Sequence, residues 1–176
     1  MNKRVVISGC SGGGKSILLA ELKRRGFAVV EEPGRRVVQD QLRNHGTALP
    51  WMDLQAFLER VVAVALDDIA SANASNQWVF FDRGLVDAVI GMQYLTGEPV
   101  RNTPGLMQHY HEQVFLAPPW PQIYVQDNER RHDLDTAAAE YSRLLEAYPL
   151  LGYSVTILPK TAVAQRADFV LRALGA

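Results

Sequence analysis

Short apolar runs alternate with amphipathic segments along this chain. The strongest helical periodicity lies within residues 53–74, where apolar side chains recur three and four positions apart: Leu54, Phe57, Leu58, Val61, Val62, Ala65, Leu66 and Ile69. This spacing places them on one face of a long helix. Trp78-Val79-Phe80-Phe81 is continuously apolar instead, which is typical of a strand covered on both faces. The pattern therefore predicts a long helix followed by a buried strand.

The same alternation extends to both ends of the chain. We expect five strands, at residues 4–8, 27–30, 78–81, 123–126 and 154–158. We expect the main helices at 17–23, from 35 to before Gly46, at 53–74, 84–95, 104–115, 137–147 and 163–174. Strands separated by helices imply an α/β fold with a parallel sheet and right-handed crossovers. In such a sheet the ligand lies beyond the carboxyl ends of the strands.

A glycine-rich segment stands between the first predicted strand and the first predicted helix. It reads Gly-Cys-Ser-Gly-Gly-Gly-Lys-Ser and matches G-x-x-x-x-G-K-[ST], the phosphate-binding loop (P-loop). Such a loop turns its backbone N–H groups toward nucleotide phosphates, and the helix after it adds a positive end. We predict that the loop binds a nucleotide through Gly9, Cys10, Ser11, Gly12, Gly13, Gly14, Lys15 and Ser16. Lys15 would reach the β- and γ-phosphates, and the Ser16 hydroxyl would hold Mg²⁺.

Composition narrows the class of protein. The 176 residues suit one domain, and 48% hydrophobic with 21% charged residues is typical of a soluble globular protein. A net charge of −1 gives no bulk attraction to nucleic acid or to anionic membranes. No apolar stretch approaches the roughly 18 residues needed to cross a bilayer. The single cysteine, Cys10, fits a reducing compartment. We expect a single-domain cytoplasmic protein without nucleic-acid partners, either a monomer or a homodimer.

Acidic residues follow the second and third predicted strands. Glu31 and Glu32 come after the second strand, where a carboxylate could accept the proton of a substrate hydroxyl that attacks the γ-phosphate. They could equally begin a solvated turn. Asp82 follows the third strand, where P-loop proteins bind Mg²⁺, although it could also cap the next helix. Arg83 could touch a phosphate or form a structural ion pair.

A charged segment follows the fourth predicted strand. Residues 127–133 include Arg130 and Arg131, which could close over the nucleotide as a lid and neutralise the transferring phosphate. A solvated loop is the alternative. His109 and His111 stand two positions apart, on different faces of a helix, so they indicate no metal site.

Two absences favour phosphoryl transfer over hydrolysis. No Asn-Lys-x-Asp segment, which reads guanine in standard GTPases, is present. Asp82 is followed by Arg rather than by the Glu that activates water in mechanical ATPases.

Several segments, in this order and spacing, together resemble a family of small P-loop kinases. They are GCSGGGKS at 9–16, VVEEPGRRVV at 29–38, VFFDRGLVDAV at 79–89, DNERRHD at 127–133 and LGYSVTILPKTAVAQRADFVL at 151–171. The family comprises AAA-type domains similar to the ribosylnicotinamide kinase module of bacterial NAD-metabolism regulators. The resemblance implies a three-layer α/β/α fold with sheet order 2-3-1-4-5 and a lid after strand four. It also implies ATP·Mg²⁺ as donor and a small hydroxyl-bearing acceptor such as a nucleoside.

The resemblance also assigns roles. The Glu-Pro after strand two is similar to the segment that supplies the catalytic carboxylate of deoxynucleoside kinases, which implies that role for Glu32. It likewise implies active-site roles for Asp82 and Arg83, and lid roles for Arg130 and Arg131. The resulting hypothesis is a small-molecule kinase in which Glu32 or Asp82 deprotonates the acceptor, Ser16 and Asp82 hold Mg²⁺, and the arginines stabilise transferred charge.

Two alternatives stay open at this stage. One is a regulatory ATP- or GTP-binding module with weak NTPase activity that controls a protein or lipid partner. The other is a nucleoside monophosphate kinase, in which Arg35, Arg36 and Arg101 could bind the acceptor phosphate.

Overall fold

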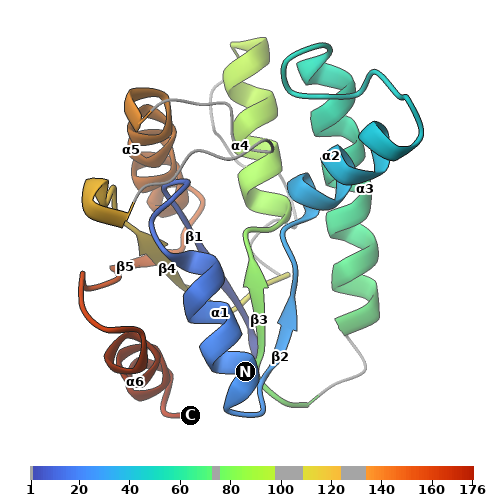
Figure 1. Ribbon diagram of the computed structural model, residues 1–176. Coiled ribbons are helices and arrows are strands. Elements are labelled where there is room, and N and C mark those ends of the chain that lie inside the picture. Colours follow the sequence, from blue (N-terminus) through green and yellow to red (C-terminus); the bar gives the residue numbers. More distant parts are fainter. Residues whose placement is uncertain (1, 73–75, 98–108, 124–133) are drawn as a thin grey trace.

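A five-stranded parallel sheet forms the centre of the molecule (Figure 1). The computed structural model describes residues 2–72, 76–97, 109–123 and 134–176. The strands are β1 (Arg4–Gly9), β2 (Ala28–Val30), β3 (Val79–Asp82), β4 (Gln113–Ala117) and β5 (Ser154–Ile157). Their order, β2-β3-β1-β4-β5, confirms the predicted α/β class and sheet order.

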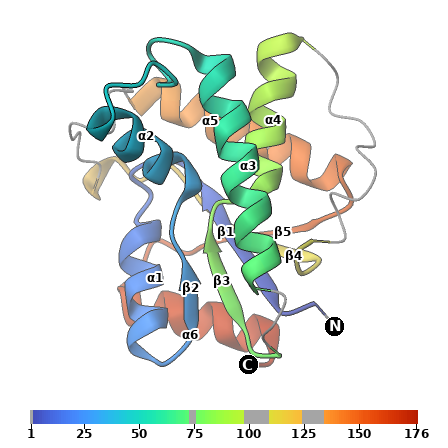
Figure 2. The ribbon, with the colours of Figure 1, turned by 90° about the vertical axis from the view of Figure 1, so that its right-hand side faces the viewer.

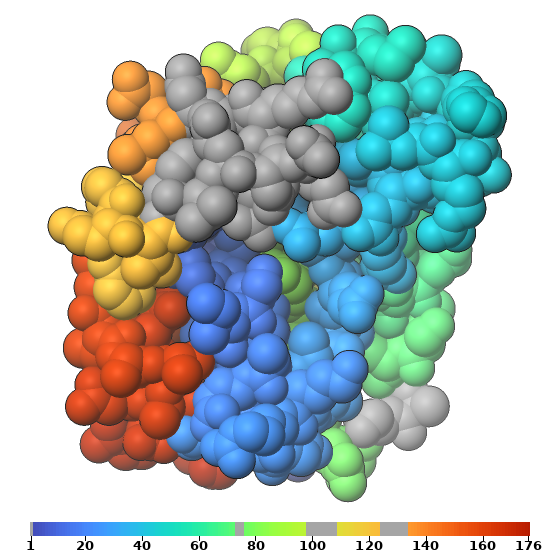
Figure 3. All heavy atoms as spheres, viewed as in Figure 1, coloured from blue at the N-terminus to red at the C-terminus, as the bar shows by residue number. Residues whose placement is uncertain are grey.

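Helices cover both faces of this sheet (Figures 1 and 2). They are α1 (Lys15–Arg24), α2 (Pro33–Arg43), α3 (Leu54–Ala72), α4 (Leu85–Thr96), α5 (Leu134–Leu150) and α6 (Val163–Leu174). Helices α1 and α6 lie side by side on one face (Figure 3). Helices α3, α4 and α5 contribute to the core on the other face. Among the described residues, no helix is both long and apolar enough to cross a membrane.

Alternating side chains of the central strands build the two cores. Val6 and Phe81 pack against α4 and α5, whereas Val5 and Phe80 pack against α1 and α6. Successive strand residues point to opposite faces, and both faces here are covered, so the strands are continuously apolar. The long helix predicted from periodicity is also confirmed, because α3 buries Leu58, Val61, Ala65 and Ile69.

The prediction for the fourth strand is wrong. We expected a helix over 104–115 and a strand over 123–126, but Gln113–Ala117 forms β4. Ile123 ends a short 3₁₀ helix, η2 (Pro121–Ile123), and residues 124–126 lie outside the described residues. The run Val114-Phe115-Leu116-Ala117 is fully buried between both helical layers, and Pro118 and Pro119 follow it directly. A short apolar run bounded by prolines suits a central strand, since proline cannot continue the ladder.

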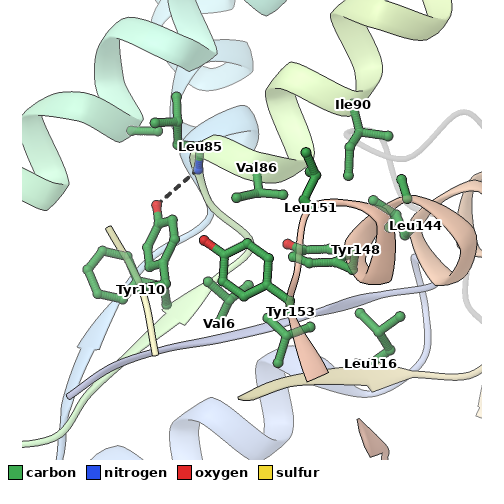
Figure 4. Packing of buried hydrophobic residues seen from close by; sticks show 14 of the residues in the cluster. Val6, Leu85, Val86, Ile90, Tyr110, Leu116, Leu144, Tyr148, Leu151 and Tyr153 are labelled. Atoms are coloured by element: carbon green, nitrogen blue, oxygen red, sulfur yellow. Dashed lines mark hydrogen bonds between the residues drawn. The ribbon is translucent and has the colours of Figure 1, made fainter. Parts of the chain in front are cut away.

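Tyrosines anchor the start of α4 within the core (Figure 4). The Tyr110 hydroxyl accepts a hydrogen bond from the Leu85 N–H at 3.0 Å. The Tyr148 hydroxyl donates to Oδ2 of Asp87 at 2.8 Å. Hydrogen bonds with core tyrosines therefore fix the first turn of α4. This turn follows the carboxyl end of β3, at the edge of the sheet where the ligand is expected.

Candidate active site

The phosphate-binding loop leaves β1 and leads into α1. Gly9 has φ +108°, and a Cβ there would lie 2.4 Å from the carbonyl oxygen of Ala117. Only glycine combines this φ with so close an approach of two backbones. The Cys10 N–H donates to the same oxygen at 2.8 Å. The loop is thus attached to the end of β4.

Lys15 and Ser16 begin α1 and line a cavity of about 230 Å³. Ser11, Gly12 and Gly14 of the loop line it as well, together with Ile17, Glu32, Arg83 and Ile123. Gly9, Cys10 and Gly13 do not, and the Cys10 thiol is buried and donates to the Ser11 carbonyl. The structure therefore brings five of the eight predicted loop residues to one cavity.

The Lys15 ammonium is buried over the loop. Its Nζ donates to the Cys10 carbonyl at 3.0 Å. Burial and the neighbouring Arg83 lower the pKa of Lys15, against the opposing effect of nearby carboxylates. A polyanion bound in this cavity would compensate the desolvated charge, as nucleotide phosphates do in P-loops.

Asp82 ends β3 and pairs in register with Ile7 of β1. Its side chain is 7% exposed, and its Oδ1 is buried without a hydrogen-bond partner. Burial, with a smaller contribution from Glu32, raises the pKa of Asp82 to about 6, against the opposing effects of Lys15 and Arg83. An unpaired carboxylate oxygen beside a phosphate loop fits the oxygen-donor set that Mg²⁺ takes, one or two protein oxygens plus phosphates and water. Asp82 and Ser16 would hold that ion.

Arg83 occupies a left-handed backbone conformation, with φ 59°. Its guanidinium contacts Glu140 of α5 at 2.7 Å, the Gly9 carbonyl at 3.0 Å and Glu32 at 3.5 Å. Burial alone would lower the pKa of Arg83, but the carboxylates of Glu140, Glu32 and Asp87 outweigh it and raise that pKa. A bulky residue with positive φ is uncommon, and such strain concentrates at functional sites. Arg83 forms ion pairs and also lines the phosphate cavity.

Glu32 occupies the N-cap position of α2 without a side-chain capping bond, and its carboxylate faces Arg83. Pro33 in the first turn fixes this entry, as it suits the first position of a helix. Glu31 is exposed and lines neither cavity described here, so the structure separates the two acidic residues that the sequence left equivalent.

Sequence analysis missed a buried carboxylate on α4. Asp87 accepts hydrogen bonds from the Ser8 hydroxyl, the Tyr148 hydroxyl and the Gly84 N–H. It also lies 3.7 Å from Arg83. The spacing Gly84-x-x-Asp87, in which a carboxylate at the third helical position accepts from the N–H of the N-cap residue, was the available signal. The partners of Asp87 on β1 and α5 are distant in the sequence, and no local pattern predicted their contacts with it.

A second cavity, of about 360 Å³, opens beside the phosphate cavity. Helices α2 to α5 and the loop before α3 surround it, with apolar walls that include Val38, Phe57, Leu58, Val61, Ala88 and Leu144. Ser11, Glu32 and Arg83 line both cavities. A group held at these three residues would therefore face both the phosphate loop and the apolar chamber.

Of the arginines predicted to bind an acceptor phosphate, Arg35 and Arg36 have different positions relative to the second cavity. Arg35 lines the second cavity, whereas Arg36 forms an ion pair with Asp68 of α3 and does not line it. Arg101, Arg130 and Arg131 lie outside the described residues. Within the described part of the chain, no group of three or more His, Cys, Asp or Glu side chains could hold a metal ion by itself.

Arg166, which sequence analysis did not single out, is buried and binds the backbone of the phosphate loop. Arg166 of α6 donates to the carbonyl of Gly14 at 3.1 Å and to that of Gly13 at 3.2 Å. Its guanidinium lies over the ring of Trp120, 5.6 Å from the centroid. Burial lowers the pKa of Arg166. Arg166 thus holds two carbonyl groups of the loop through hydrogen bonds.

Solved structures share this fold at low sequence identity. A deoxyadenosine kinase from M. mycoides with bound dATP matches with a TM-score of 0.65 and 12% identity, over 99% of this chain and all of that one. The shikimate kinase of Acinetobacter baumannii, in complex with shikimate, matches with a TM-score of 0.65 and 13% identity, over 99% of this chain and 93% of that one. The shikimate kinase of Aquifex aeolicus gives a TM-score of 0.58 and 13% identity, over 98% and 96%. These likenesses establish the fold shared with P-loop kinases.

Sequence comparison places the chain in a family. No curated protein matches it significantly. The family model described as an AAA domain matches residues 4–166, which include the phosphate loop, Glu32, Asp82, Arg83 and Arg166. The match covers most of the chain and confirms the AAA-type domain that the motifs indicate. This protein belongs to the AAA domain family.

Proposed function

We propose that this protein is an ATP-dependent kinase that transfers the γ-phosphate to a hydroxyl of a small nucleoside-like acceptor. The observation that carries the proposal is that two neighbouring cavities share lining residues. One is built on the phosphate loop and the other is largely apolar, and Ser11, Glu32 and Arg83 line both. Direct transfer requires donor and acceptor to meet in line at such a junction.

On the donor side, the loop would bind the ATP phosphates. The buried Lys15 would contact the β- and γ-phosphates, and the Ser16 hydroxyl and Asp82 would hold Mg²⁺. The ion, when bound, neutralises charge that develops on the phosphate oxygens.

The geometry supports a division of roles between the two candidate carboxylates. Glu32 lines both cavities, so it can reach the proton of an acceptor hydroxyl. Asp82 is not among the described residues that line either cavity. We therefore assign Glu32 as the general base. We assign Asp82 as a Mg²⁺ ligand on a different ground, its buried Oδ1 without a hydrogen-bond partner close to Lys15.

Arg83 would stabilise the transferring phosphoryl group. Its guanidinium already lies at the junction, held by Glu140 and the Gly9 carbonyl, so it needs little reorganisation when negative charge develops. Arg130 and Arg131, outside the described residues, would add to this charge as lid residues.

The second cavity suits an acceptor of nucleoside size. Its volume of about 360 Å³ falls in the range of small-ligand sites, and Phe57 offers an aromatic ring in its wall. Arg36 is engaged with Asp68, which removes one of the cations that a nucleoside monophosphate kinase would need.

The test is acceptor-dependent ADP formation from ATP·Mg²⁺. The panel comprises nucleosides, nucleotides, nicotinamide riboside and aminoglycoside-like alcohols, with Lys15→Ala as the control. We expect one class to accelerate ADP formation, the Lys15→Ala variant to be inactive, and Glu32→Gln to lose most of the acceleration while retaining ATP binding. Tight nucleotide binding without stimulation by any acceptor would contradict the kinase assignment for that panel and support a regulatory nucleotide-binding module.

A further inference from the structure

An arginine stacked on a tyrosine marks the outer end of the apolar cavity. Helix α4 starts beside the phosphate loop, and Tyr94 lies nine residues after Leu85, about 13 Å further along the helix. Tyr94 is 65% exposed, so this end of the cavity faces solvent. The guanidinium carbon of Arg143, from α5, lies 4.0 Å from the centroid of the Tyr94 ring, and both residues line the cavity.

Arg143 differs from the other arginines around the site in its partners. Arg83 pairs with Glu140, and Arg36 pairs with Asp68. Among the described residues no carboxylate forms an ion pair with Arg143, and its contact is the Tyr94 ring. A guanidinium stacked on an aromatic face keeps its N–H edge available, and that planar fork matches a carboxylate.

Carboxylates and arginines are unevenly distributed along the cavity. At the phosphate-loop end, Glu32, Asp87 and Glu140 surround Arg83, so three carboxylates face one guanidinium. This end disfavours an anionic acceptor group and suits a hydroxyl that gives up its proton. Arg143 follows Glu140 by about one turn of α5, and its guanidinium lies over the exposed Tyr94 ring rather than among these carboxylates. Arg35 is a further cation in the lining.

We propose that the acceptor carries a carboxylate at the end remote from the phosphorylated hydroxyl, and that Arg143 binds this carboxylate. The inference rests on the proposed kinase function and narrows its acceptor to hydroxylated ring compounds that bear a carboxylate. The apolar walls between the two ends, with Phe57, Val61 and Ala88, hold the ring. Arg143 is a specificity residue in this scheme and takes no part in the bond-making step.

Matched pairs of acceptors test the proposal. Nicotinic acid riboside and nicotinamide riboside differ only in a carboxylate against an amide, and shikimate and its methyl ester differ in a carboxylate against an ester. Initial rates with ATP·Mg²⁺ are measured for the wild type, Arg143→Gln and Arg143→Lys. Arg60→Gln, an exposed position on α3 outside the cavity lining, is the matched control.

We expect the wild type to prefer a carboxylate-bearing member of a pair. Arg143→Gln should raise the KM for that acceptor about 10- to 100-fold, as expected for a lost hydrogen bond to a charged group, with kcat and the KM for ATP changed far less. The KM for the neutral partner should stay constant. Arg143→Lys should restore part of the affinity, and Arg60→Gln should behave like the wild type. A purely structural contact between α4 and α5 would affect both members of a pair equally.

Calorimetric binding to the protein with a non-hydrolysable ATP analogue separates this inference from the kinase assignment. If none of the four compounds stimulates ADP formation, the kinase assignment fails for them, while a carboxylate preference removed by Arg143→Gln still supports the site. A wild type that binds the neutral members as tightly as the carboxylates, or binds no carboxylate, overturns the inference even if a neutral acceptor is phosphorylated. An Arg143→Gln variant that loses both members equally also overturns it.

Discussion

Arg83 and Glu140 form a two-pronged ion pair between the end of β3 and helix α5. Nη1 of Arg83 donates to Oε1 of Glu140 at 2.7 Å, and Nη2 donates to Oε2 at 3.3 Å. Arg83 contacts Glu32 at the same time, so the orientation of one guanidinium depends on two helices that lie on different sides of the cavity junction.

Glu140→Gln should therefore lower kcat by roughly 10-fold, because the amide weakens a charge-assisted pair that would, in the proposed kinase reaction, orient Arg83 toward the transferring phosphate. The KM for ATP should change little. Steady-state kinetics check this, with Glu146→Gln, an exposed position on the same helix, as control. Equal losses in both variants would argue against a positioning role for Glu140.

Gly9→Ala should unfold the phosphate loop or the protein. Its Cβ would lie 2.4 Å from the Ala117 oxygen, and φ is +108°. Gly26 is the matched control, since φ is +94° but a Cβ there would meet nothing within 4 Å. Thermal unfolding and nucleotide binding should show a loss of about 1 kcal/mol for Gly26→Ala, from backbone strain alone, and a much larger loss for Gly9→Ala. Similar losses would show that the contact with β4 is unimportant.

Asp82→Asn should stabilise the metal-free protein near neutral pH. The pKa of Asp82 is raised from 3.8 to about 6, so folding favours the protonated form. The stability this gives is complete below pH 4 and is lost as the pH rises through 6. The neutral amide should thus gain up to about 3 kcal/mol over the wild type at pH 7.5, and the gain should vanish towards pH 4. Chemical denaturation with EDTA at several pH values measures it.

The same substitution should remove Mg²⁺-dependent turnover. A variant more stable than the wild type but inactive would identify Asp82 as a residue retained for function. A variant less stable at pH 7.5 would contradict the burial argument.

Tyr148→Phe should lower the free energy of unfolding by about 1 kcal/mol, because it removes one of the donors to the buried Asp87. Combined with Asp87→Ala the effect should be less than additive, since the hydroxyl then lacks its acceptor. Tyr94→Phe, at an exposed position, should be neutral. Additive losses would show that the two residues do not interact.

Local patterns in the sequence predicted most of the fold, and long-range contacts account for what they missed. The loop motif, the period of α3 and the run before Asp82 each carry their signal within a few neighbouring residues, and each is confirmed as an element. β4 was missed because a short apolar run can belong to a helix or a strand, and only its pairing with β1 and β5 decides.

In the site, too, local patterns predicted some residues and long-range contacts determine others. The loop motif predicted Lys15 and Ser16, and the end of an apolar strand predicted Asp82. Asp87, Glu140 and Arg166 take their significance from partners 79, 57 and 152 positions away. No spacing in the sequence reports such contacts.

The two cavities draw on different parts of the architecture. The phosphate loop is supported by α1 and by Arg166 of α6, whereas α2 to α5 wall the apolar chamber, and three residues belong to both. Substitutions at Phe57 or Val61 can therefore reshape the chamber without disturbing the nucleotide half. Under the proposed kinase function, descendants of this protein could therefore change the acceptor through a few substitutions in the chamber wall while they keep the same phosphate donor.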